Sequence, residues 1–316
     1  MPRVAAIDCG TNSIRLLIAD VEPATGVLTD VTRLMTVVRL GQDVDRTGEF
    51  APEALERTFA ALDDYAARCR ELGAEAVRFV ATSATRDARN RDVFLAGVRD
   101  RLGVDAEVIS GHEEASLSFT GVVSAVHGAP APYLVVDLGG GSTELALGDG
   151  ELRDAYSMDV GCVRLTERHL AADPPTEAQV SAAVADVQDA LAVAMRDVEI
   201  GDARTLVGVA GSITTVTAHA LHLTHYDPDE IHGAVLSIDR VIASCDALIH
   251  ATYAERAAMP FMHPGRVEAI GAGALVWREV VLAVVAAVAE QGGHLVTVTT
   301  SEHDILDGIA LALARP

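Results

Sequence analysis

Apolar and polar residues along this chain recur with two periods, one typical of β-strands and one typical of α-helices. Short apolar runs bounded by glycine or aspartate, such as residues 4–7 and 133–136, predict buried strands. Longer stretches with apolar residues three or four positions apart, such as 52–72 and 177–198, predict amphipathic helices. Strands and helices follow each other in mixed order, so the pattern predicts an α/β fold whose mixed sheets are flanked by helices.

Turn and cap residues set the bounds of the elements. Pro52 opens the first long helix and Gly73 ends it, at positions where proline and glycine are favoured. The other expected elements are strands at 31–40, 76–81, 105–110, 155–160, 205–209 and 294–300, and helices after 81 to 102, at 111–126, from about 266, and at 304–314.

The stretch from Asp137 to Leu145 is distinctive because three consecutive glycines separate two apolar runs, a pattern that predicts two strands joined by a tight turn. Glycine has no Cβ, so its amide groups can close around an anion, and the hydroxyl groups that follow add donors. Asp137 and Glu144 suit Mg²⁺, which prefers carboxylate, water and phosphate oxygens. The stretch predicts either a turn that binds a metal–phosphate ligand or an ordinary hairpin with a flexible tip. The turn residues are Gly139, Gly140, Gly141, Ser142 and Thr143.

A second copy of this pattern near the amino terminus favours the functional interpretation. When Asp8 is aligned with Asp137, glycine, serine and leucine positions coincide at a constant separation of 129 residues (137 − 8). A repeat at about one domain length indicates two duplicated halves that face each other across a cleft. Each half then offers a phosphate-binding turn and an acidic residue. The turn residues of the first copy are Gly10, Thr11, Asn12 and Ser13.

Two other expected strands also end in residues that suit an anion. The strand at 76–81 delivers Arg86, whose planar guanidinium matches phosphate, although the residue also reads as a surface arginine at a helix start. The strand at 205–209 precedes Gly211 and Ser212, which predict an anion site at a helix amino terminus.

The helix expected at 111–126 begins with two adjacent glutamates, Glu113 and Glu114. Adjacent residues on a helix point about 100° apart, so only one of them can face a ligand. From the pattern alone, both also read as carboxylates that interact favourably with the positive end of the helix dipole.

Together, these motifs resemble the exopolyphosphatase/guanosine pentaphosphatase (Ppx/GppA) family. The resemblance covers essentially the whole chain. It implies two ribonuclease-H-like domains of the actin-like ATPase superfamily, identifies Glu114 as the catalytic glutamate, and favours Arg86 as a phosphate ligand. It also supports Gly211 and Ser212, which lie at the superfamily's nucleotide position. The motifs are Asp8-x-Gly-Thr-Asn-Ser, Ala81-Thr-Ser-Ala-Thr-Arg86, Gly111-His-Glu-Glu-Ala115, Asp137-Leu-Gly-Gly-Gly-Ser-Thr-Glu-Leu145, Gly161-Cys-Val-Arg-Leu-Thr-Glu167 and Ser301-Glu-His-Asp-Ile-Leu-Asp-Gly-Ile309.

The segment from Gly128 to Pro132 is rich in proline and is the clearest linker. We therefore expect a first domain over residues 1–127 and a second over 128–316. The last helix, at 304–314, is expected to pack back on the first domain.

Composition restricts the partners of the protein. The chain has 316 residues, of which 50% are hydrophobic and 22% charged, so two domains with large cores are expected. Its net charge is −22, and all 24 basic residues are arginine. This charge argues against binding to nucleic acid or to a membrane surface, both of which require a basic face. A polyanionic substrate remains compatible if arginines, amide groups and Mg²⁺ make the site locally positive.

Several features of the sequence indicate a cytoplasmic protein. No apolar run reaches the roughly 18 residues of a membrane span, and the nearest, at 280–289, is too short. The first residues lack a signal-peptide pattern. The four cysteines are scattered without a Cys-x-x-Cys pair and are expected to be reduced, buried thiols.

Histidines recur every three residues after Gly211, at His219, His222 and His225, and His232 follows. A zinc site is one interpretation. Because steps of three residues spread side chains around a helix, and no cysteine or carboxylate clusters with them, solvated or capping histidines are favoured.

The motifs and the resemblance predict a phosphohydrolase that depends on Mg²⁺, with Mn²⁺ as the alternative ion, and removes the terminal phosphate of inorganic polyphosphate. Glu114 is expected to deprotonate the attacking water, and Arg86 to neutralise developing charge. Asp8, Asp137 and Glu144 are expected to hold the metal. The rival functions are hydrolysis of guanosine pentaphosphate, an actin-like nucleotide-binding kinase or filament protein, and an inactive polyphosphate-binding module. A homodimer is implied by the resemblance alone.

Overall fold

The amino-terminal repeat forms an antiparallel hairpin of β1 (Arg3–Cys9) and β2 (Ser13–Glu22). β2 pairs with β3 (Val27–Val37), while β1 pairs in parallel with β4 (Ala76–Ala81), and β4 pairs in parallel with β5 (Ala106–Val108). The first sheet is therefore mixed, with the strand order β3-β2-β1-β4-β5. Its antiparallel start agrees with the three successive strands that the sequence predicts.

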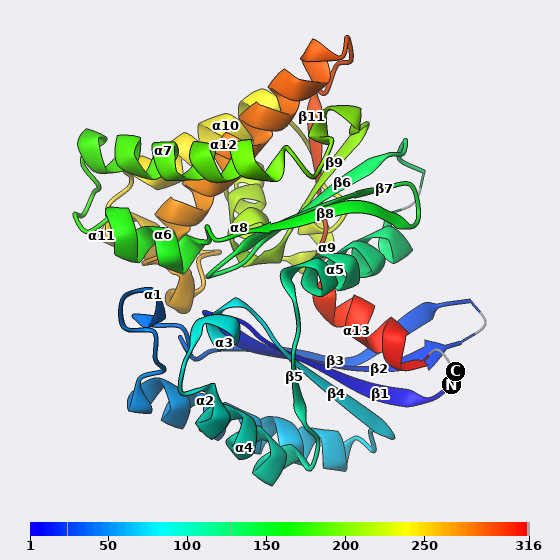
Figure 1. Cartoon of the computed structure of the whole chain (residues 1–316). Coiled ribbons are helices and arrows are strands. Elements are labelled where there is room, and N and C mark those ends of the chain that lie inside the picture. Colours follow the sequence, from blue (N-terminus) through cyan, green and yellow to red (C-terminus); the bar gives the residue numbers. More distant parts are fainter. Residues whose placement is uncertain (24, 127, 315–316) are drawn as a thin grey trace. The chain divides into compact units, whose positions relative to one another are not determined.

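Helices cover both faces of this sheet (Figure 1). Alternate residues of a strand point to opposite faces, so Ala5 and Ile7 pack with α2 and α4, whereas Val4 and Ala6 pack with α13. Asp8 has the same parity as Val4 and Ala6, so it belongs to the face that α13 covers. The helices are α1 (Val44–Thr47), α2 (Pro52–Glu71), α3 (Ser83–Asp87), α4 (Arg91–Leu102), α5 (Gly111–Ala125) and α13 (Ile305–Ala314).

The second repeat forms the hairpin of β6 (Tyr133–Leu138) and β7 (Thr143–Gly148) in a second mixed sheet. The order of this sheet is β10-β11-β9-β6-β7-β8, with β6 and β9 parallel. Its remaining strands are β8 (Leu152–Met158), β9 (Thr205–Val209), β10 (Val235–Ser237) and β11 (Thr297–Thr300). Its helices are α6 (Cys162–His169), α7 (Glu177–Ala194), η1 (Ile200–Asp202), α8 (Ala210–Leu221), α9 (Pro228–Ile231), α10 (Ile238–His250), α11 (Tyr253–Ala257), η2 (Pro264–Arg266) and α12 (Ile270–Glu290).

The register of the two hairpins confirms the internal repeat. Asp8 lies directly opposite Arg15 in the first hairpin, and Asp137 lies directly opposite Glu144 in the second, so each pair is separated by the same number of residues. In both turns the amide after the strand closes onto a serine carbonyl at 3.0 Å, from Gly10 in one and from Gly139 in the other.

The computed structural model describes residues 1–23, 25–126 and 128–314, and its chain divides into two compact units. Unit 1 combines Met1–Ser124 with Asp304–Pro316, and unit 2 is Ala125–His303. The boundary expected between 127 and 128 touches residue 127, which lies outside the described residues. The last helix, α13, belongs to unit 1, where it contacts β1, β2 and β4.

One predicted helix and one expectation about the length of apolar segments differ from the observed structure. The helix expected between β4 and residue 102 is split because Ala88 is extended and the side chain of Asn90 bonds both backbone groups of Phe50, at 2.8 and 3.1 Å.

The expectation that no segment could span a membrane is wrong by length and composition, because α12 has 21 residues. The apolar run at 280–289 is only its second half. Two thirds of its apolar window (67%) is buried inside the protein, as in the core helix of a globular unit.

Candidate active site

The turn of the first hairpin holds its backbone carbonyls inward. The carbonyl of Asn12 accepts from the amides of Val38 and Arg39 at 3.0 and 2.8 Å, and the carbonyl of Thr11 accepts from Gly41 at 2.8 Å. The turn can therefore offer an anion its amide groups, other than that of Gly10, rather than its carbonyls.

Asp8 is buried at the end of β1, with 5% of its surface exposed. The Nε and Nη2 atoms of Arg15 donate to its Oδ2 at 3.1 and 2.7 Å. Its Oδ1 is buried and has no hydrogen-bond partner among the described residues. Burial raises the pKa of Asp8, and Arg15 opposes that shift. A buried carboxylate oxygen without a partner is costly, so Oδ1 is suited to bind a ligand such as a divalent cation.

The predicted base and the predicted cation lie together in unit 1. Arg86, on α3, donates from Nη1 to the Oε2 of Glu114 at 2.7 Å and to the carbonyl of Ile109 at 3.1 Å. Glu114, in the first turn of α5, is 8% exposed. The adjacent Glu113 is more exposed and pairs with Arg78 at 2.9 Å. The two glutamates are therefore in different environments, and only Glu114 is buried beside Arg86.

The glycine turn of unit 2 is fixed by the helix that follows its sheet. The carbonyl of Gly140 accepts from the amides of Val163 and Arg164 at 2.9 and 3.1 Å, and Nε of Arg164 donates to the carbonyl of Gly141 at 2.7 Å. The first turn of α6 thus occupies the carbonyls, so the turn can offer an anion its amide groups other than that of Gly139, which bonds Ser142. The carbonyl of Gly139 is bonded in the same way, by the amide of residue 162 at 3.0 Å.

The hydroxyl groups of this second turn have unequal roles. Thr143 is fully buried, and its hydroxyl donates to the carbonyl of Val160 at 2.6 Å. The sequence predicts that this hydroxyl donates to phosphate, but its proton is already used in the bond to Val160. Ser142 lies at the turn and is also buried.

Asp137 and Glu144 are buried carboxylates that face each other across two antiparallel strands. Directly opposed residues lie on the same face of a sheet, where like charges destabilise the pair. Ser157 donates to Glu144 at 2.7 Å. In unit 1 the position of Glu144 is taken by Arg15, which neutralises Asp8. The second hairpin instead brings two acids together, which suits a cation.

In unit 2, α8 follows β9 as α3 follows β4 in unit 1. Gly211 lies 129 residues after Thr82 (211 − 82), the separation of the internal repeat. A Cβ at Gly211 would lie 2.4 Å from the guanidinium of Arg266. That guanidinium donates to Thr215 at 3.3 Å and has no ion-pair partner among the described residues. The side chain of Ser212 packs against Gly273 of α12 instead of at the helix end. Gly211 and Arg266 are thus the residues of this region that suit an anion.

The donors present fit Mg²⁺ in the manner typical of phosphate chemistry. No group of three or more histidine, cysteine, aspartate or glutamate residues is arranged to hold a metal within residues 1–23, 25–126 and 128–314. Mg²⁺ usually takes one or two carboxylates and completes its shell with water and substrate phosphates. The unpartnered Oδ1 of Asp8 and the Asp137–Glu144 pair match that demand.

The histidines in and after α8 differ in environment. His219 is half-buried against Phe261, with ring centroids 6.2 Å apart, and burial lowers its pKa. His222 ends α8 in the left-handed conformation. His225 is exposed and lies 3.4 Å from Asp227.

Three residues of these sites were not predicted, namely Arg15, Arg266 and Asp304. The hairpin register could have found Arg15, since equal strand lengths place it opposite Asp8. Asp304 lies in the motif at 301–309, but no local signal gives its partner or that of Arg266, because Asp304 meets Arg15 across 289 residues and Arg266 meets Gly211 across 55.

Comparisons with known proteins agree with the motifs. The model described as the Ppx/GppA phosphatase family matches residues 17–309. A protein of Mycobacterium tuberculosis named Exopolyphosphatase 2 is 53% identical over 321 residues, which cover 99% of each chain. A guanosine-5'-triphosphate,3'-diphosphate pyrophosphatase of Photobacterium profundum is 33% identical over 213 residues, covering 67% of this chain and 42% of that protein.

A solved structure confirms the predicted fold class. The crystal structure of an exopolyphosphatase-like protein matches with a TM-score of 0.95 and 47% identity, over 99% of this chain and 98% of the other. The chain is an α/β protein of two ribonuclease-H-like units, each a mixed sheet flanked by helices.

Proposed function

The chain belongs to the Ppx/GppA phosphatase family, and from that premise we propose that it is an exopolyphosphatase. It hydrolyses the terminal phosphoanhydride bond of inorganic polyphosphate and releases orthophosphate. The observation that carries the choice of substrate is the 53% identity, over 99% of both chains, with a protein named Exopolyphosphatase 2.

Glu114 is the group that activates water in this proposal. A water oxygen attacks the terminal phosphorus, Glu114 accepts a proton from that water, and the bond from phosphorus to the bridging oxygen breaks. The shortened chain keeps the bridging oxygen, and orthophosphate leaves. Burial of the Glu114 carboxylate, with Arg86 2.7 Å away, supports the assignment because both groups are held in one place before substrate binds.

In this proposal, amide groups and guanidinium groups bind the phosphates of the substrate. The carbonyls of residues 11–13 and 139–142 are bonded within their own units, which supports donation to phosphate oxygens by the turn amides other than those of Gly10 and Gly139. Arg86 stabilises the charge that develops on the transferred group, and electrostatic stabilisation of this kind dominates phosphoryl transfer.

The proposal includes a Mg²⁺ ion, for which Mn²⁺ can substitute. Its proposed ligands are Asp8, Asp137 and Glu144. A bound Mg²⁺ neutralises charge on the phosphate oxygens. We expect EDTA to abolish orthophosphate release and excess Mg²⁺ or Mn²⁺ to restore it. Full activity in EDTA after extensive dialysis would contradict this assignment.

Hydrolysis of guanosine pentaphosphate is the second candidate, favoured by the similarity to the Photobacterium profundum pyrophosphatase. The deciding experiment measures orthophosphate release from polyphosphate and from guanosine pentaphosphate, separately and in competition. We expect a higher kcat/KM for polyphosphate. A higher kcat/KM for guanosine pentaphosphate would make that nucleotide the proposed substrate. Failure to release orthophosphate from either substrate would refute both candidates.

Compartment and assembly are also proposals. All four cysteines are free and buried, which supports a reducing compartment such as the cytoplasm. A homodimer is proposed from family membership, and light scattering on the purified protein tests it.

A further inference from the structure

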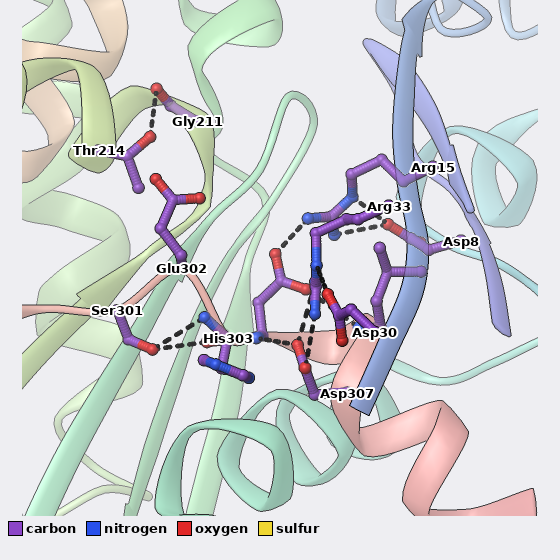
Figure 2. A network of polar contacts seen from close by, with 12 residues as sticks. Asp8, Arg15, Asp30, Arg33, Gly211, Thr214, Ser301, Glu302, His303 and Asp307 are labelled. Atoms are coloured by element: carbon purple, nitrogen blue, oxygen red, sulfur yellow. Dashed lines mark hydrogen bonds and ion pairs between the residues drawn. The ribbon is translucent and has the colours of Figure 1, made fainter. Parts of the chain in front are cut away.

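One guanidinium in unit 1 is shared between two aspartates that lie far apart in sequence. Arg15 donates from Nε and Nη2 to Asp8, and its Nη1 pairs with the carboxylate of Asp304. Figure 2 shows Arg15 reaching Asp8 from the neighbouring strand. Asp304 is the residue at which the chain re-enters unit 1. The cluster holds two carboxylates and one guanidinium, so with both acids ionised its net charge is −1.

Asp304 itself has little freedom to move. Its Oδ1 accepts from the amide of Leu306 at 3.0 Å, as a residue that caps a helix does, and its own amide donates to Asp307 at 2.9 Å. Asp307 is fully buried and bonds two nitrogens of Arg33, at 2.7 and 3.2 Å (Figure 2). The carboxylate that faces Arg15 is therefore held by the start of α13.

The same end of α13 packs against the backbone of α5, the helix that carries Glu114. A Cβ at Gly121 would lie 1.9 Å from the carbonyl oxygen of Asp304, and a Cβ at Gly308 would lie 2.0 Å from the carbonyl oxygen of Leu117. Only glycine permits this approach of the two helices. The start of α13 thus contacts both the helix of the proposed base and the arginine that holds Asp8.

We propose that Asp304 is a positioning residue of the active site, which acts on Asp8 through Arg15. By holding one arm of the guanidinium, Asp304 restricts Arg15 to a single oxygen of Asp8 and leaves Oδ1 for a divalent cation. The negative charge of the cluster also favours that cation. Residues one step removed from a metal ligand typically change metal affinity or activity by about 10–100-fold. This inference rests on the proposed function only for the role of the cation in hydrolysis.

The test is a titration of the metal-free protein with Mn²⁺, in which paramagnetic resonance measures free Mn²⁺. Asp304→Ser and Asp304→Asn both retain an oxygen that can cap α13 but remove the charge that faces Arg15. We expect Mn²⁺ affinity to fall about 10–100-fold in both variants, and kcat for polyphosphate to fall while KM changes little. Having two variants keeps the test valid if one of them does not fold.

Asp30→Asn is the matched control. Asp30 pairs with Arg33 at 2.9 Å in the same unit and does not touch Arg15. Wild-type Mn²⁺ affinity in a folded Asp304 variant, an equal loss in Asp30→Asn, or no Mn²⁺ binding by the wild-type protein would each overturn the proposal. A wild-type protein that binds Mn²⁺ but hydrolyses neither substrate refutes the proposed function alone, and the Mn²⁺ comparison then still decides the role of Asp304.

Discussion

Glu114 and Glu113 are adjacent in sequence but have different partners, and this difference predicts unequal effects of mutation. Glu114 is buried beside Arg86, whereas Glu113 pairs with Arg78 nearer the surface. We expect Glu114→Gln to lower kcat by about 10²–10⁴-fold, the usual contribution of a general base, with little change in KM. Glu113→Gln should behave as wild type. Steady-state orthophosphate release measures both, and equal losses in the two variants would remove Glu114 from this role.

His219 predicts a dependence of stability on pH. Burial lowers its pKa below the ordinary value of about 6.5, so the unfolded chain takes up the proton first as pH falls. The stability that neutral His219 contributes is present above that ordinary value and is lost as pH falls through the pKa of the folded protein. We expect the midpoint of urea unfolding to fall less between pH 7.5 and pH 5.5 in His219→Leu than in the wild-type protein. The exposed His225 provides the control variant, His225→Gln, which should lose as much as wild type.

At the residue scale, the sequence predicts chemistry better than it predicts partners. Asp8 could be selected because an aspartate ends an apolar run before a glycine turn. Strand pairing places Arg15 opposite Asp8. Asp304 reaches the same guanidinium only through tertiary folding across 289 residues. Thr143 shows the opposite error, since a hydroxyl in a promising turn is used by the carbonyl of Val160.

At the scale of elements, α6 determines the shape of the second glycine turn, and Gly161 permits their contact. A Cβ at Gly161 would lie 2.6 Å from the backbone of Gly140. We expect Gly161→Ala to lower stability by about 1–3 kcal/mol, as overpacking does, and to raise KM because the turn amides move. Gly10→Ala is the control for stability, because its Cβ would be 3.6 Å from the nearest atom, the carbonyl oxygen of Ser13. Chemical denaturation and KM measurements test both; wild-type values for Gly161→Ala would contradict this account.

The elements that were predicted well are those with strong periodicity and clear end signals. α2 begins at Pro52 as expected and ends within two residues of Gly73. The sequence predicts one helix from β4 to residue 102, whereas the contacts of Asn90 with Phe50 interrupt it. Such a side-chain contact with a distant backbone leaves no trace in local periodicity.

At the scale of the whole molecule, the internal repeat predicts the two-unit organisation from the sequence alone. The separation of 129 residues extends from the hairpins to their parallel neighbours, since Asp8 pairs with Val80 and Asp137 with Val209. The discontinuity of unit 1 depends on α13, whose apolar residues pack beside β1 and β2. The amphipathic pattern of this helix predicts only that one face is buried, so the expectation that it packs back on the first domain does not follow from periodicity.

The overall charge of −22 predicts how salt affects long substrates. In the proposed complex the terminal phosphates contact amide and guanidinium groups, whereas the rest of a long chain extends over the surface of a protein in which 46 acidic residues outnumber 24 arginines. Raising NaCl from about 10 to about 100 mM shortens the Debye length from about 30 to about 10 Å and screens that repulsion. At constant free Mg²⁺, kcat/KM for long-chain polyphosphate should therefore rise relative to kcat/KM for tripolyphosphate. A falling ratio would mean that a local basic surface guides long chains in spite of the net charge.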